Sequence, residues 1–159
     1  MKKILTLIAL VIAVATVNAQ TTSSANQTVT LNLQNAITIS VGTATGTSFT
    51  FNTTDHYKNG LTNTAASTFN VKSNRPWAVT VAAATADFTS TATTKMPASV
   101  LGVRLNGGSN FTQLSTTAAS FTSGARGNND FTVDYNANPS YNYDEGTYTL
   151  SVVYTATQQ

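Results

Sequence analysis

Apolar side chains occupy every second position near the C-terminal end of this chain: Tyr148, Leu150, Val152, Tyr154 and Ala156. Thr and Ser fill most of the positions between them. Successive side chains of a strand point to opposite faces, so the pattern predicts a strand with one face in a core and the other in water. Such a strand needs further strands to cover it, which directs the chain toward an all-β fold.

The residues that lead into this stretch carry a second signal. Asp144, Gly146 and Tyr148 give the pattern Asp-x-Gly-x-Tyr, which matches the tyrosine corner of immunoglobulin-like sandwiches. In that motif the Tyr hydroxyl bonds to nearby upstream backbone. We therefore predict a structural role for Tyr148.

The same alternation recurs along the chain. Odd positions from Val29 to Val41 are apolar except Asn35, which predicts one long first strand or two joined at a bulge. Residues 52–64 have loop chemistry. Trp77 begins another alternating stretch, so we expect its indole in the core. Together with strands expected at 49–51, 69–71, 77–81, near 88, at 101–105 and at 131–135, the sequence predicts an antiparallel immunoglobulin-like β-sandwich of seven to nine strands.

Residues 1–19 have the pattern of a secretory signal peptide. Lys2 and Lys3 precede an apolar run, and small residues end at Ala19. Cleavage there would leave 140 of the 159 residues, with 20–27 as a flexible leader and 28–159 as one sandwich domain. No second apolar run follows, so the mature protein is not expected to span a membrane.

Charge and cysteine content narrow the function classes. The chain has eight Lys and Arg residues and six Asp and Glu residues. Without Lys2 and Lys3, six basic residues remain against the six acidic ones. A chain near neutrality offers little counterion release, so nucleic acid is excluded as a partner class. The chain has no Cys, so the exported domain must depend on its core alone for stability.

Two stretches carry a family resemblance. The run from Phe69 to Val81, with Ser73-Asn74-Arg75-Pro76-Trp77 at its centre, and the end of the chain from Gly146 to Ala156 resemble the bacterial WxL-like and spore-coat-U-like secreted surface domains. The resemblance covers most of the mature chain, and its motifs are loose. It implies an exported immunoglobulin-like sandwich at a cell surface or in a fibre.

The inventory of reactive side chains argues against an enzyme. His56 is the single histidine, so a catalytic triad or a histidine-based zinc site lacks partners. A nucleophile elbow and a phosphate-binding glycine loop are also missing from the sequence. We expect no catalytic residues.

Oxygen-bearing residues near the end of the chain have the spacing of a calcium loop. Asp134, Asn136 and Asn138 alternate, and Glu145 stands at the twelfth position. Pro139 occupies the sixth position, where such a loop needs glycine. The spacing therefore predicts a looser calcium site, with an ordinary polar loop as the alternative. No other cofactor is expected.

Tyr141 and Tyr143 lie in the same loop beside Asn142. Aromatic faces next to amides suit a glycan, and the alternative is a pair of rings packed over the end of the sandwich.

These observations favour a non-enzymatic, secreted bacterial surface or extracellular structural protein, or a periplasmic one, that associates with itself or with the cell envelope. A small carbohydrate-binding module is the alternative. The segment with Val29, Leu31 and Leu33 can be an ordinary first strand, or it can be exchanged with the sheet edge of a neighbouring subunit.

Overall fold

The computed structural model describes residues 21–44 and 47–159, so the expected signal peptide at 1–19 lies outside the described residues. The chain divides into two units between Asn32 and Leu33. In the first unit, residues 21–32 contain no helix or strand, and all of them are exposed. All helices and strands of the described residues belong to the second unit.

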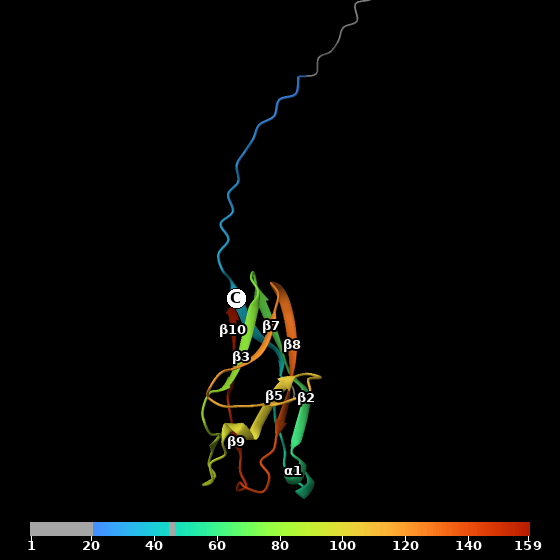
Figure 1. Cartoon of the computed structure of the whole chain (residues 1–159), viewed down its shortest axis with the longest axis vertical. Coiled ribbons are helices and arrows are strands. Elements are labelled where there is room, and N and C mark those ends of the chain that lie inside the picture. Colours follow the sequence, from blue (N-terminus) through green and yellow to red (C-terminus); the bar gives the residue numbers. More distant parts are fainter. Residues whose placement is uncertain (1–20, 45–46) are drawn as a thin grey trace, which may run out of the picture. The chain divides into compact units, whose positions relative to one another are not determined.

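The second unit is built from antiparallel strands (Figure 1). The five-stranded sheet has the order β1-β2-β8-β5-β6, and the three-stranded sheet has the order β10-β3-β7. A small pair, β4 and β9, completes the set. The bounds are β1 Ile37–Ala44, β2 Leu61–Ser73, β3 Trp77–Ala83, β4 Thr89–Ser90, β5 Leu101–Leu105, β6 Thr112–Gln113, β7 Ala119–Gly124, β8 Gly127–Ala137, β9 Tyr148–Thr149 and β10 Val152–Gln158.

The two larger sheets share their core. Val81 of β3, Val103 of β5 and Val133 of β8 are each at most 1% exposed and belong to one apolar cluster. A second cluster is centred on Val71 and Trp77. Inward residues alternate with outward ones along β3, as its sequence pattern predicts. The all-β, sandwich-like character expected from the sequence is therefore confirmed.

The predicted first strand is wrong over its N-terminal half. β1 begins only at Ile37 and pairs with β2, whereas residues 29–35 pair with no strand of the described chain. Period-two alternation makes a segment able to form a strand, but a strand also needs a neighbour for its backbone hydrogen bonds. Val29, Leu31 and Leu33 are consequently 75%, 78% and 82% exposed.

Other departures are local. Phe49 and Phe51 lie outside any strand, although both pack partly buried against the core. The predicted last strand is interrupted at Leu150 and Ser151, between β9 and β10. Residues 21–44 and 47–159 form ten strands rather than the predicted seven to nine, because three pieces of two residues, β4, β6 and β9, are formed.

One short helix, α1 (Thr54–Asn59), lies in the stretch expected to be loop, and a 3-10 turn spans Ala98–Val100. The Thr53 hydroxyl accepts from the His56 backbone N–H and caps α1. Gly60 ends the helix at φ +72°, a conformation that favours glycine. Within the described residues no helix has the length and hydropathy needed to cross a membrane.

Candidate functional site

Two adjoining hollows reach the apolar core, and the smaller of them lies between β1 and β10. The larger one, called here the end cavity, has a volume of about 500 Å³ and lies toward α1 and β9. The smaller one, called here the groove, has about 250 Å³ and is lined by residues of both β1 and β10. Thr47, Phe49, Leu101 and Leu150 line both, so the hollows adjoin.

The groove is mostly apolar. It is lined by the buried residues Phe69 and Leu101, by Val41 of β1, and by Val152 and Tyr154 of β10. Among its polar atoms are the hydroxyls of Tyr135 and Tyr154, which bond to each other at 3.0 Å. Burial raises the pKa of both phenols above the usual value, so both stay neutral at physiological pH.

In the three-stranded sheet, the inward side chains of β3 are more deeply buried than those of β10. On β3, Trp77, Val79, Val81 and Ala83 are between 1% and 4% exposed. On the neighbouring β10, the inward residues Val152, Tyr154 and Ala156 are only partly buried. The apolar interior is therefore dry beneath β3 and still accessible beneath β10.

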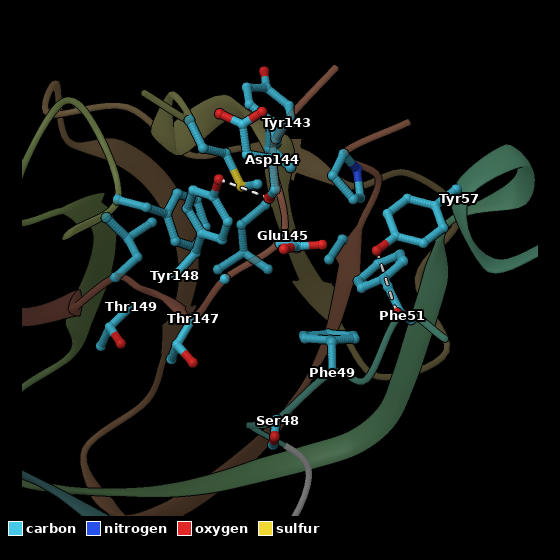
Figure 2. Close-up of a pocket in the computed structure, with 18 of the residues that line it drawn as sticks. Ser48, Phe49, Phe51, Tyr57, Tyr143, Asp144, Glu145, Thr147, Tyr148 and Thr149 are labelled. Carbon is cyan, nitrogen blue, oxygen red and sulfur yellow. Dashed lines mark hydrogen bonds between the residues drawn. The ribbon is translucent and has the colours of Figure 1, made fainter. Parts of the chain in front are cut away.

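The end cavity is rich in aromatic rings. Figure 2 shows Tyr148 on one side of it and Phe51 and Tyr57 on the other, with Glu145 between them. The Tyr57 hydroxyl donates to the Phe51 carbonyl at 3.3 Å. Tyr57 was not singled out in the sequence, because a single aromatic residue in a polar stretch gives no periodic signal.

Tyr148 makes the bond that a tyrosine corner predicts. Its hydroxyl donates to the backbone carbonyl of Asp144, four residues upstream, at 3.0 Å (Figure 2). Trp77 is 3% exposed and lies in the core, although its indole N–H has no hydrogen-bond partner among the residues that the structure describes. The stability that the core position of Trp77 and the hydroxyl bond of Tyr148 contribute stays a prediction.

Tyr141 and Tyr143 do not form a pair. Tyr143 lines the end cavity and contacts the Tyr148 ring edge-on, with centroids 6.5 Å apart. Tyr141 is 63% exposed, stacks on Tyr57 at 5.8 Å and donates to the Thr54 carbonyl. One ring therefore faces the cavity and the other faces solvent.

The four residues of the predicted calcium loop have different surroundings. Asp134 is buried in β8, and its carboxylate accepts from Arg104 at 3.0 Å, from Asn106 at 2.7 Å and from the Ala65 N–H at 2.8 Å. Asn136 donates instead to the Leu61 carbonyl. Asn138 lies against Gly60 beside α1, and Glu145 lines the end cavity.

Asp134 has a structural task in this arrangement. Burial by itself would raise its pKa, but the bonds from Asn106, Ala65 and Arg104, and the Arg104 charge, outweigh burial and hold the pKa below its usual value. Ala65 has φ +51° where the β2–β8 register shifts. The carboxylate therefore holds a bulge in β2. In the described part of the chain, no three His, Cys, Asp or Glu side chains are grouped as a metal site would require.

The comparisons with known proteins add no family. No protein-family model matches the chain, and no curated protein matches it either.

Proposed function

We propose that this protein is a non-enzymatic, exported structural protein that assembles with copies of itself at a bacterial surface or in an extracellular fibre. The observation that carries the proposal is the accessible apolar interior between β1 and β10, which is lined by Val41, a residue that is 58% exposed. A soluble protein rarely leaves connected apolar surface uncovered unless something binds there.

The proposal includes an immunoglobulin-like topology. In such sandwiches one sheet has the strand order A-B-E-D, and strands C, F and G form the other. The order β1-β2-β8-β5 suits A-B-E-D in chain order, and β3 and β10 suit C and F. A buried Trp at the start of β3 and a tyrosine corner just before β10 stand where that fold has them.

The proposed location follows from the signal-peptide pattern at residues 1–19 and from the resemblance to WxL-like and spore-coat-U-like surface domains. A mature chain with few charges and many Thr side chains on its strands suits an extracellular surface, because hydroxyls keep exposed strand faces hydrated.

Purified protein beginning at Gln20 tests the proposal. Negative-stain electron microscopy and light scattering should show fibres, sheets or discrete oligomers at micromolar concentration. A monodisperse monomer under all salt and pH conditions tried would contradict self-assembly.

A carbohydrate-binding module is the second candidate, and the exposed Tyr141 ring supports it. The ring stacks on Tyr57 beside the end cavity, and an exposed aromatic face is a suitable platform for a sugar. Glycan-array binding should then be lost in Tyr141→Ala and kept in Tyr141→Phe. Equal binding by both variants would remove this candidate.

A further inference from the structure

We infer that the groove beside β10 is filled by residues 28–34 of a second copy, which add to the sheet as an extra strand. This inference rests on the proposed self-assembly and names the segment that carries it. Residues 28–34 are called here the donor segment. The structure supplies three independent arguments: the place for a strand, a segment that fits it, and the direction in which that segment must run.

The added strand would pair with the free edge of β10. β10 pairs with β3 on one side and is the last strand of its sheet among the described residues. Edge strands are usually protected by charged residues, by Pro or by bulges. The seven residues of β10, VVYTATQ, include no charge and no Pro, and their pairing with β3 is unbroken. In the topology proposed above, this edge is also where strand G would stand beside strand F.

The donor segment matches that place in pattern and length. Val29, Leu31 and Leu33 alternate with Thr30 and Asn32, and the three apolar side chains are 75–82% exposed. Seven residues in a strand span about 23 Å at about 3.3 Å each, which is also the length of β10. One face of the added strand would place its three apolar side chains over the groove, and the other would present hydroxyl and amide groups to water.

The direction in which the added strand would run favours a donor segment from a second copy over the donor segment of the same chain. Gln158 at the end of β10 donates to the Ala36 carbonyl just before β1, and Val41 of β1 lines the groove with Val152 of β10. β1 and β10 therefore run in opposite directions. A segment that turned back just before β1 would run parallel to β10, whereas all strand pairs of the described sheets are antiparallel.

The last residue of the donor segment and the backbone that follows it are also held in place on their own subunit. Asn74 accepts from the Ala36 N–H and donates to the Gln34 carbonyl, and its own N–H donates to the Ala36 carbonyl. A reversal at residues 34–36 would have to break these bonds. A donor segment from another copy meets no such constraint and can lie antiparallel to β10, the pairing that is slightly more stable per residue.

The test uses the full chain beginning at Gln20 with one charge added to the donor segment. Leu31→Asp places a carboxylate on the face that enters the groove, so assembly measured by light scattering should be lost. Thr30→Asp adds the same charge one residue away, on the face that points to solvent, and should assemble like the wild type. Equal assembly of all three proteins overturns the inference and leaves the proposed function standing.

Disulfide coupling identifies the partner segment directly, because the chain has no Cys of its own. Protein with Leu31→Cys is mixed with protein carrying Val152→Cys or Ala156→Cys, whose side chains point inward, or Thr155→Cys, whose side chain points outward. Interchain disulfides with position 152 or 156, and few with 155, are expected, since a disulfide needs Cα atoms about 4.4–6.8 Å apart.

Two results of this coupling experiment overturn the inference. One is coupling at 155 as extensive as at 152 and 156. The other is a disulfide that forms only when both cysteines are in one chain, which would assign the groove to the chain's own segment. A wild-type protein that never assembles refutes the proposed function by itself, and coupling at high protein concentration then still decides whether the groove accepts the donor segment.

Discussion

Tyr148 joins the loop before β9 to the strand itself through a single hydroxyl. The bond to the Asp144 carbonyl is exposed, whereas Tyr148 itself is half-buried and lines the end cavity. We expect Tyr148→Phe to lower the free energy of unfolding by about 1 kcal/mol, the usual net contribution of one such bond. Denaturant unfolding measures it, and Tyr141→Phe, which loses a comparable bond from a residue that is 63% exposed, is the control. An unchanged midpoint for Tyr148→Phe would contradict a tyrosine corner.

Trp77 and Gly124 are a matched pair in the core. They lie opposite each other on β3 and β7, and a Cβ at Gly124 would overlap with the indole Cζ2 of Trp77. Trp77→Ala should cost roughly 3–5 kcal/mol through the cavity it leaves. Gly124→Ala should cost about 1–3 kcal/mol through overpacking.

The double variant Trp77→Ala/Gly124→Ala separates the two effects in thermal or denaturant unfolding. Without the indole, the added methyl group has space, so the double variant should be little worse than Trp77→Ala alone. Strict additivity of the two costs would contradict the close contact.

Asp134 links stability to pH. Its pKa is lower in the folded protein than the usual 3.8, so its contribution is fully present above about pH 5 and decreases as the pH falls below about 4 toward the folded-state pKa. Asp134→Asn should cost about 2 kcal/mol at pH 7 by weakening the bonds to Ala65 and Arg104. Asp130→Asn, at an exposed position, is the control.

The difference between the wild type and Asp134→Asn should shrink as unfolding is repeated toward pH 3. A difference that stays constant from pH 7 to pH 3 would mean that the carboxylate charge contributes nothing to the bulge in β2.

At the scale of elements, β10 should show two kinds of backbone amide. Amides bonded to β3 are held within the sheet, whereas alternate N–H groups on the free edge face solvent. In monomeric protein at low concentration, hydrogen exchange should be slow for the first kind and fast for the second, and fast throughout residues 21–33.

Assembly should then slow exchange both at the outer amides of β10 and in the donor segment. The edge of β7, on the other side of the same sheet, provides an internal control. Slower exchange at β7 with no change at β10 would place the contact between copies on the wrong edge for the inferred strand addition.

For the whole molecule, calcium binding stays a prediction. A calcium ion that binds only to the folded state would add about 2.7 kcal/mol of stability when its free concentration is 100 times its Kd. The melting temperature should then rise by several degrees at millimolar calcium, and Glu145→Gln should reduce the rise. No rise in the wild type would leave Asn136 of β8, and Asn138 and Glu145 between β8 and β9, as ordinary polar residues.

Local pattern in the sequence was sufficient for much of the fold. The alternation at residues 77–81, 101–105 and 131–135 predicted β3, β5 and part of β8, because side-chain period is a property of each strand by itself. The core position of Trp77 and the corner bond of Tyr148 followed from the same local signals. Helix α1 was missed because six residues are too few to show a helical period.

What the tertiary structure decided was which segments meet. Residues 29–33 have the same period as β1, yet no strand of the described chain pairs with them, and period alone cannot show a missing partner. Asp134 resembled a calcium ligand in sequence, but its bonding partners Ala65, Arg104 and Asn106 lie 28 to 69 residues away. The groove arises in the same way, because its walls on β1 and β10 are more than 100 residues apart and only folding brings them together.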